Sequence, residues 1–385
     1  MPTMKTVYLD YNATTPLDPA VRQAMLPFLD EIWANPSSVH HLGRRARAAL
    51  DDARDRAARV LKCRPSEIVF TSGGTESANL AILGTARRLR SKGRHLITSA
   101  VEHHCILHAM EHLARAEGFE LTLLPVDSEG RVSVESLAQA IRPDTVLVSI
   151  MAANNEIGTL QPIADLGSFC RARGILFHAD AVQWFGKEPV DSIHQFNADL
   201  VSICAHKIHG PKGAGALFIR SPLHPDPILF GGSHENERRA GTENLAAIIG
   251  LVEALERFVP TPVFDKVRLK PLAERLTAAI RAIPGTQVIS PATQSLANTV
   301  SFVVAGTDSI AVLANLDLEG ICASSGSACS AGSLEPSHVV RALGLPSDLA
   351  HSLVRFSLGR ETTESDIDHV EAVLPAIIRR AQHAE

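Results

Sequence analysis

The chain has 385 residues, of which 45% are hydrophobic and 21% charged, and its formal net charge is −5. This composition is that of a globular protein with a substantial core, and the length favours two domains. The slightly acidic balance gives no reason to expect nucleic acid or an anionic membrane as partner. No apolar run reaches the roughly 18 residues of a membrane helix, and the N-terminus lacks the pattern of a signal peptide. We therefore expect a cytoplasmic protein.

Strand and helix patterns alternate along the first two thirds of the chain. Apolar strands are predicted at residues 66–70, 95–99, 120–125, 146–151, 175–179, 200–203 and 214–219. Helical segments, such as one at residues 76–89, lie between most of them. This alternation predicts a mostly parallel sheet with helices on both faces. The last strand follows a Pro-Lys-Gly turn and is expected to run back beside its neighbour.

A second region begins near residue 260, where the sequence Pro-Thr-Pro-Val marks a junction. It contains a long helical stretch, a strand at residues 299–304, a loop of small residues and a helix at about residues 364–382. These elements predict a smaller α/β domain. No flexible linker separates the two regions, so we expect them to pack closely.

The loop at residues 324–337 carries a single cysteine, Cys329, among serines, alanines and two glycines, Gly326 and Gly332. Such a run cannot pack a core. A structural cysteine would have apolar neighbours instead. The loop therefore predicts a thiol on a mobile, water-accessible tether, and this suggests sulfur chemistry.

The other cysteines are scattered and form no Cys-x-x-Cys pair, which argues against a disulfide framework. We considered zinc because residues 103–105 and 204–209 offer histidine and cysteine ligands. Structural zinc sites usually need two separated pairs of closely spaced ligands, and that pattern is absent. We predict no resident metal.

Polar groups that suit a cofactor follow three of the predicted strands. Gly74 and Thr75 lie in a glycine turn that opens a helix, where backbone N–H groups can face a phosphate. Asp180 follows a buried strand and needs a cation there. Lys207 follows another strand, and partial desolvation would favour a Schiff base. Each feature also has an ordinary structural interpretation. The glycine turn could simply start a helix, Asp180 could be half of an ion pair, and Lys207 could be a surface lysine. Together they are what pyridoxal phosphate requires.

Three further residues have a functional and a structural interpretation. Asn155 closes a strand and could bind a ligand, or simply belong to a turn. His103 could stack on a cofactor ring, although a lone histidine is more often structural. Arg355 is a candidate clamp for a substrate carboxylate, or a member of an ion pair on a strand.

The motifs together resemble the cysteine desulfurases of the class V aminotransferase family, in the group with a long cysteine-bearing loop. The matching segments run almost end to end, at residues 8–15, 35–40, 72–77, 154–158, 178–183, 206–213, 239–244, 324–337 and 355–360. The loop is most similar to the nitrogen-fixation type and also resembles the iron–sulfur housekeeping type. The loop sequence does not distinguish between these two types.

The resemblance implies an α/β, fold type I pyridoxal-phosphate enzyme like aspartate aminotransferase. Residues 16–259 would form the large domain, with a mainly parallel seven-stranded sheet. Residues 1–15 and 260–385 would form the smaller α/β domain that carries Cys329. A homodimer with shared active sites is also implied.

The resemblance further implies a set of residues that bind pyridoxal phosphate: Gly74, Thr75, His103, Asn155, Asp180, Gln183, Cys204, His206, Lys207 and Thr242. Lys207 would form the Schiff base, Asp180 would pair with the pyridinium nitrogen, and Gln183 would contact the phenolic oxygen. Thr242 would reach the phosphate from the other subunit. Cys204 departs from the pattern, because many relatives have serine there and a thiol is a weaker donor.

For the substrate, L-cysteine, the resemblance implies that Asn35, Asn155 and Arg355 hold the molecule. Lys207, His103 and Cys329 would be catalytic, with His103 as proton acceptor for the thiol. The products would be L-alanine and a persulfide on Cys329. An iron–sulfur scaffold protein would then accept the sulfur, and Cys329 could transiently ligate an iron–sulfur cluster.

Two other functions stay open from the sequence. A selenocysteine lyase or an aminotransferase would use the same cofactor without needing Cys329. A non-catalytic sulfur carrier or iron–sulfur scaffold would need several clustered cysteines, whereas the loop has one.

Overall fold

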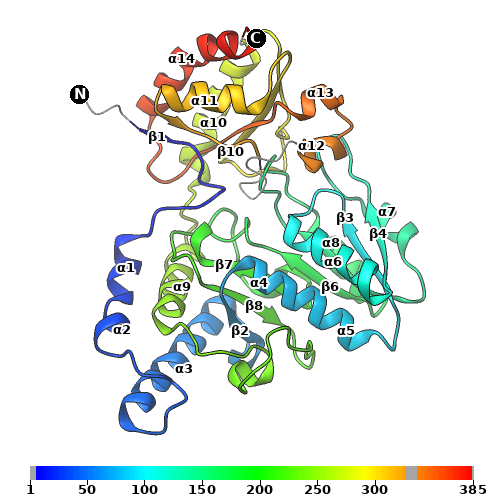
Figure 1. Ribbon diagram of the computed structural model, residues 1–385, viewed down its shortest axis with the longest axis vertical. Coiled ribbons are helices and arrows are strands. Elements are labelled where there is room, and N and C mark those ends of the chain that lie inside the picture. The colour runs from blue at the N-terminus through cyan, green and yellow to red at the C-terminus, as the bar shows by residue number, and fades with distance from the viewer. Residues whose placement is uncertain (1–5, 327–335, 384–385) are drawn as a thin grey trace.

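The computed structural model describes residues 6–326 and 336–383 (Figure 1). Cys329 therefore lies outside the described residues, as do most residues of its loop. The described chain contains a seven-stranded sheet, a three-stranded sheet and a two-stranded pair. Within it, no helix has both the length and the apolar character needed to cross a membrane.

The large sheet has the strand order β2-β8-β7-β6-β5-β3-β4. The strands are, in that order, Ile68–Thr71, Gly215–Ile219, Leu200–Cys204, Leu176–Asp180, Thr145–Met151, His95–Ser99 and Glu120–Leu124. Only β8 runs antiparallel to its neighbours, β2 and β7, and the remaining pairs are parallel. The predicted mainly parallel seven-stranded sheet is confirmed, including the strand that runs back.

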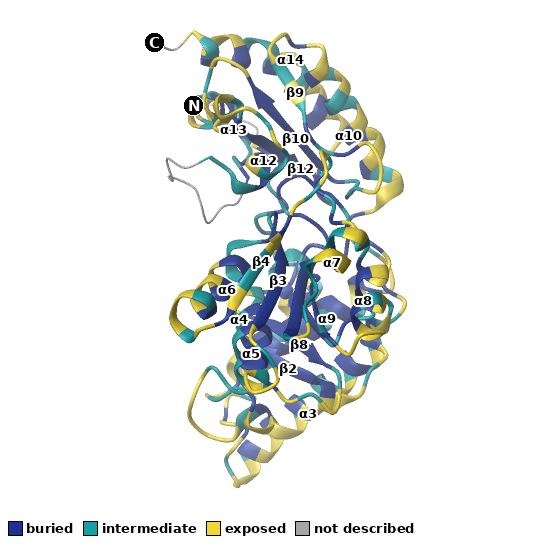
Figure 2. Cartoon of the chain, turned by 90° about the vertical axis from the view of Figure 1, so that its right-hand side faces the viewer, coloured by how far each residue is buried: buried dark blue, intermediate teal, exposed yellow. Residues whose placement is uncertain are grey.

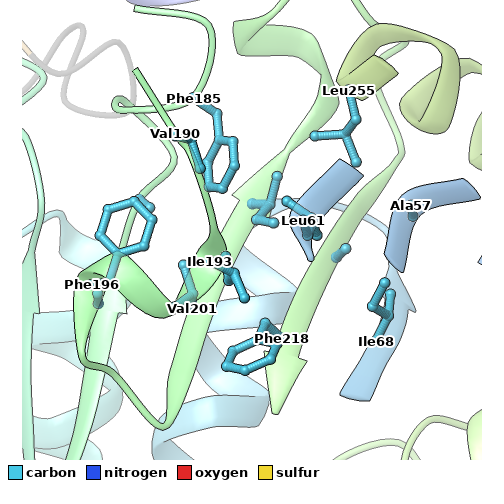
Figure 3. Packing of buried hydrophobic residues seen from close by; sticks show 14 of the residues in the cluster. Ala57, Leu61, Ile68, Phe185, Val190, Ile193, Phe196, Val201, Phe218 and Leu255 are labelled. Carbon is cyan, nitrogen blue, oxygen red and sulfur yellow. The ribbon is translucent and has the colours of Figure 1, made fainter. Parts of the chain in front are cut away.

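Helices cover both faces of this sheet because its strands are apolar on both sides. In β8, Phe218 packs into a cluster with α3 (His41–Leu61) and α9 (Leu245–Phe258), whereas Leu217 packs on the opposite face with α6 (His104–Glu117). Alternate residues of a strand point to opposite faces, so a fully apolar strand fills two cores. Figure 3 shows the first cluster, where Phe218, Val201 and Ile68 meet Ala57 and Leu61 of α3.

The remaining helices of this region are short: α1, α2, α4, α5, α7 and α8 span Pro19–Met25, Pro27–Asp30, Gly74–Asn79, Thr85–Leu89, Val134–Ala140 and Ile163–Arg171. The helical stretch predicted at residues 76–89 is confirmed, and within it a π-helical turn at Leu80–Gly84 separates α4 from α5. The 225–226 loop approaches closely there, and Asp226 N donates to the Gly84 carbonyl at 3.1 Å. Insertion of this donor explains the wider turn.

The smaller α/β part is built on the antiparallel sheet β12-β10-β9, formed by Val354–Ser357, Thr299–Val304 and Thr286–Val288. Helices α10 (Lys266–Arg281), α11 (Ser309–Leu318) and α14 (Glu364–Gln382) pack on it, and α12 (His338–Ala342) and α13 (Ser347–Ala350) lie beside it. Figure 2 shows most strands of both sheets buried, apart from the edge strands β4 and β9, with exposed residues on the outer sides of the helices.

The N-terminal strand β1 (Val7–Tyr8) pairs in parallel with β11 (Ile321–Cys322), far along the chain. Its Val7 belongs to the hydrophobic cluster of α10 and α14. In Figure 1 it accordingly lies in the same upper part of the molecule as these helices. This packing agrees with grouping residues 1–15 with 260–385, although the domain boundaries themselves stay a prediction.

Candidate active site

A cavity of about 180 Å³ lies where the parallel strands of the large sheet end. Strand β5 ends at Met151, β6 at Asp180 and β7 at Cys204, and this edge of an open α/β sheet is where ligands bind. The cavity is lined by Asn12, Ala13, Gly74, Thr75, His103, Cys105, Met151, Ala153, Asn155, Asp180, Val182, Gln183, Cys204, His206, Lys207 and Arg355. The structure thus brings together most of the predicted site residues.

Lys207 reaches the cavity from a single 3₁₀ turn, Ala205–Lys207, that follows β7 directly. Its Nζ donates to the backbone carbonyl oxygens of Asn12 and Ala13, each at 2.7 Å. These carbonyls come from the N-terminal segment, so the amine is positioned by a part of the chain almost 200 residues away. A lysine held by two acceptors is poised for attack on an aldehyde or for proton transfer.

Asp180 is the carboxylate of the cavity and is 6% exposed. Its Oδ1 accepts a hydrogen bond from Val182 N at 3.0 Å. Burial raises the pKa of Asp180 to about 6, against the opposing effects of that hydrogen bond and of Lys207. A carboxylate in such a place gains from a further cation, and a pyridinium nitrogen would supply it.

His103 caps the N-terminus of α6, and its Nδ1 accepts from Cys105 N at 3.2 Å. Burial, followed by the charge of Lys207, lowers the pKa of His103 to about 4. The imidazole is therefore neutral near pH 7. Since Nδ1 is the acceptor, the single ring proton belongs on Nε2.

The glycine turn that opens α4 is closely packed at Gly74. A Cβ added to Gly74 would come within 2.8 Å of Val182 Cγ2. Glu76 braces the turn, because its Oε2 accepts from Ser72 N at 2.9 Å and its Oε1 pairs with Arg239 at 2.7 Å. Backbone N–H groups at such a helix start suit a phosphate.

Two side chains flank this turn across the cavity. Cys204 is 3% exposed, and burial raises the pKa of its thiol, which therefore stays protonated. Burial, followed by the charges of Lys207 and Lys212, lowers the pKa of His206 to about 4, and its Nδ1 lies 3.1 Å from Thr14 Oγ1. Both groups are neutral hydrogen-bonding partners at neutral pH.

Arg355 lies on β12 and is 1% exposed. Its Nη2 pairs with Asp10 Oδ1 at 2.7 Å and its Nη1 donates to the Asn155 carbonyl at 2.8 Å. Its buried Nε has no hydrogen-bond partner within the described chain. Arg355 can therefore form an ion pair with Asp10 and also bind a substrate carboxylate, because its Nε–H remains as a donor.

The chain matches the sequence model described as "Aminotransferase class-V" over residues 7–370. It belongs to the class V aminotransferase family. A protein named cysteine desulfurase IscS from Dictyoglomus turgidum is 47% identical over 377 residues, covering 98% of this chain and 95% of the relative. One of the same name from Methanosarcina thermophila is 46% identical over 379 residues, covering 98% and 93%.

Solved structures agree with this assignment. A NIFS-like protein superposes with a TM-score of 0.90 at 34% identity, covering 97% of this chain and 100% of the other. A structure described as SspA in complex with cysteine gives a TM-score of 0.81 at 35% identity, with 93% and 100% covered. The predicted family and fold are confirmed.

Three predicted residues are not brought into the cavity of this class V aminotransferase. Asn35 is exposed, and its Oδ1 accepts from Ser37 N at 2.8 Å within its own turn. Thr242 is also exposed and lines a separate cavity of about 200 Å³ with Arg239 and Glu235. Cys329 lies outside the described residues. Its predicted role, like the roles of Asn35 and Thr242, stays a prediction.

The described ends of the cysteine loop lie at the wall of the active-site region. The backbones of Ser324 and Arg355 exchange hydrogen bonds of 3.2 and 2.7 Å. Beyond the undescribed residues, Ser337 Oγ donates to Glu156 Oε2 at 2.6 Å. Glu156 directly follows Asn155, so both ends of the loop attach to segments that line the cavity.

Sequence reasoning missed several residues of the site, above all Asn12. Asn12 is 1% exposed, and its backbone oxygen accepts from Lys207 Nζ and from Gln183 Nε2, the latter at 2.9 Å. It lies in the 8–15 segment that the resemblance included without giving it a role. The sequence shows that Asn12 lies in the middle of this motif, but it does not show which residues Asn12 contacts.

Proposed function

We propose that this protein is a cysteine desulfurase, which removes sulfur from L-cysteine and yields L-alanine and an enzyme persulfide on Cys329. The observation that carries the proposal is one cavity in which a lysine, a buried carboxylate and an arginine with an unsatisfied Nε converge. The names of relatives 43–47% identical over nearly the whole chain support the same activity.

The donor set fits pyridoxal phosphate. Lys207 would hold its aldehyde carbon, Asp180 its ring nitrogen and Gln183 its phenolic oxygen, while His103 would stack on the ring with Asn155 nearby. The phosphate would bind to Gly74, Thr75 and His206, with the neutral thiol of Cys204 beside them. When bound, this cofactor supplies the electron sink that allows the α-proton of an amino acid to leave.

The chain's own residues then divide the remaining tasks. The Arg355 Nε, with Asn155 and Asn35, would hold the substrate carboxylate. Lys207 would take the proton from the substrate's α-carbon. Asp180 would keep a proton on the ring nitrogen, because a buried carboxylate is stabilised by the cation that results. His103 would hold and move a proton at Nε2.

Cys329 would receive the sulfur. As a thiolate, it would attack the sulfur of bound cysteine, so that a sulfur–sulfur bond forms while the carbon–sulfur bond breaks. The electron pair of the broken bond stays on carbon, which takes up a proton to become the methyl group of alanine. The persulfide would then pass its outer sulfur to an iron–sulfur scaffold protein.

We further propose a cytoplasmic homodimer with shared active sites. Thr242, exposed on its own subunit, would reach the cofactor phosphate of the other subunit. A role in trans accounts for its position outside the cavity of its own chain.

The proposal is tested with purified wild type, Lys207→Ala and Cys329→Ser. Wild type should show a visible absorbance band that borohydride removes and should release alanine from L-cysteine. Lys207→Ala should lose both. Cys329→Ser should keep the band, respond to added cysteine and release almost no alanine. Alanine release by Cys329→Ser at a near-normal rate would instead favour a lyase, and absence of the band from wild type would favour a sulfur carrier.

A further inference from the structure

Lys187 is a buried lysine to which the proposed mechanism gives no task. It lies in the turns after β6 and is 4% exposed. Its Nζ donates to Asn12 Oδ1 at 2.6 Å and to Gln183 Oε1, and it lies 5.1 Å from the centre of the Phe264 ring. Lysine is almost never fully buried unless it is paired, since an ammonium group loses its hydration.

The hydrogen-bond partners of Lys187 are neutral, and within residues 6–326 and 336–383 no carboxylate pairs with it. Desolvation lowers the pKa of Lys187 well below its usual value, and the charged groups that face it, Lys207 after β7 and Arg355 on β12, lower it further. Such a residue is costly to the fold. A requirement of the neighbouring site would explain why it is a lysine.

The contact of Lys187 with Gln183 fixes how the Gln183 amide lies. The two residues are four apart in a helical turn, which puts them on one side of it. Gln183 Oε1 accepts from Lys187, while Gln183 Nε2 donates to the Asn12 carbonyl at 2.9 Å. Turning the amide round would place its oxygen against the Asn12 carbonyl, which only accepts, so Oε1 is the atom that faces Lys187. The second N–H of Gln183 Nε2 thus remains for the cavity that Gln183 lines.

Asn12 connects this arrangement to the catalytic lysine. Its Oδ1 also accepts from Asn298 Nδ2 at 3.1 Å, and its Nδ2 donates to Thr299 Oγ1 at 2.9 Å, so its amide orientation is fixed as well. Its backbone oxygen accepts from Lys207 Nζ at 2.7 Å. The two lysines therefore meet on one residue, Lys187 on its side chain and Lys207 on its backbone.

We propose that Lys187 is a positioning residue that acts through Gln183, holding Nε2 of this amide toward the phenolic oxygen of bound pyridoxal phosphate. The inference rests on the proposed function and assigns a task to a residue outside the cofactor's own contacts. A donor at the phenolic oxygen draws negative charge from it. The proton shared with the neighbouring cofactor–lysine nitrogen is then held less tightly, so loss of the donor should raise the pH at which that proton leaves.

The test is a pH titration of the visible absorbance band of the holoenzyme. Lys187→Met has a similar length and no donor, and we expect its midpoint to lie about one pH unit above that of wild type. Lys187→Gln keeps a donor and should fall between the two. Lys266→Met is the control: Lys266 pairs with Glu188 at 3.5 Å, its side chain is 53% exposed, and its removal should leave the midpoint unchanged.

A double-mutant comparison separates positioning from the effect of charge. In a Gln183→Ala background, Lys187→Met should cause no further shift, because the amide on which it acts is gone. A full additional shift there would overturn the proposal, as would an unchanged midpoint in Lys187→Met alone. If Lys187→Met does not fold, Lys187→Gln replaces it in the wild-type and Gln183→Ala backgrounds, and the same two outcomes apply. A wild type without any visible band would instead overturn the proposed function, and this inference with it.

Discussion

At the scale of single residues, two buried carboxyl groups beside the cavity differ in how their burial is compensated. Asp180 has Lys207 nearby, and its pKa is raised only to about 6. Glu102 is 0% exposed, and burial raises its pKa to about 8. Its Oε1 accepts from Ser99 Oγ at 2.6 Å and from Met151 N at 3.0 Å, whereas its Oε2 has no hydrogen-bond partner among the described residues. Glu102 is therefore a neutral acid at pH 7, next to the proposed catalytic His103.

Glu102 predicts a specific loss of stability at alkaline pH. Its folded pKa is raised, so the folded state binds the proton more tightly than the unfolded state, and stability falls as pH rises from about 4.5 to about 8. Glu102→Gln is neutral throughout and should escape this loss, which amounts to about 5 kcal/mol at most. Thermal unfolding from pH 5 to 9 should show the variant gaining several degrees on wild type toward high pH. A difference between the two proteins that stays constant with pH would contradict this.

At the scale of elements, the π-helical turn at Leu80–Gly84 depends on Gly84. A Cβ on Gly84 would lie 2.4 Å from the Asp226 backbone oxygen and 3.0 Å from Pro225 Cβ. Backbone cannot move aside as a side-chain end can, so Gly84→Ala should push the 225–226 loop away and destabilise the fold by about 1–3 kcal/mol. Denaturant unfolding measures this.

The matched control for Gly84→Ala is Gly231→Ala. The only atom that its added Cβ would meet within 4 Å in the described chain is the Ala240 Cβ, at 3.0 Å. We expect a smaller loss of stability for this variant, because no backbone atom of the described chain stands in the way of its Cβ. Equal effects of the two substitutions would mean that the close approach of the loop at Gly84 is unimportant.

The sequence predicted the bounds of several strands correctly. The strands at residues 95–99 and 299–304 have the predicted bounds. The strand predicted from residue 66 begins instead at Ile68, because Pro65 opens a 3₁₀ turn that includes residues 66 and 67. The π-helical turn escaped prediction, since it depends on a loop more than 140 residues away.

The same distinction holds in the site. Asp180 and Lys207 were predictable because Asp180 ends β6 and Lys207 comes three residues after β7, so that chain order alone carries them to the sheet edge. Asn12 and Lys187 were not, because their contact joins residues 175 positions apart through side-chain hydrogen bonds. Burial of Lys187 with no acidic partner in the described part of the chain also contradicts what residue statistics lead one to expect. Such exceptions concentrate where function constrains the chain.

At the scale of the whole molecule, the proposed dimer completes the active site. Thr242 and Asn35 are exposed on their own subunit. The other residues proposed to bind cofactor or substrate, apart from Cys329, line a single cavity. Large apolar side chains are exposed in the same regions of sequence: Trp33 is 69% and Phe230 83% exposed. A second copy of the chain that covered these regions would bury apolar surface and bring Thr242 toward the other cavity.

Sharing of sites in trans predicts that two inactive variants restore each other. Thr242→Glu should repel the cofactor phosphate, and Lys207→Ala lacks the lysine, so each homodimer should be inactive. After the two are unfolded, mixed in equal amounts and refolded with cofactor, half of the dimers are mixed. Each mixed dimer has one site with an intact Lys207 and an intact Thr242 from the other subunit. Alanine formation should therefore recover to about a quarter of the refolded wild-type rate. If Thr242 acted within its own subunit, both sites of every mixed dimer would carry a defect, and no activity would return.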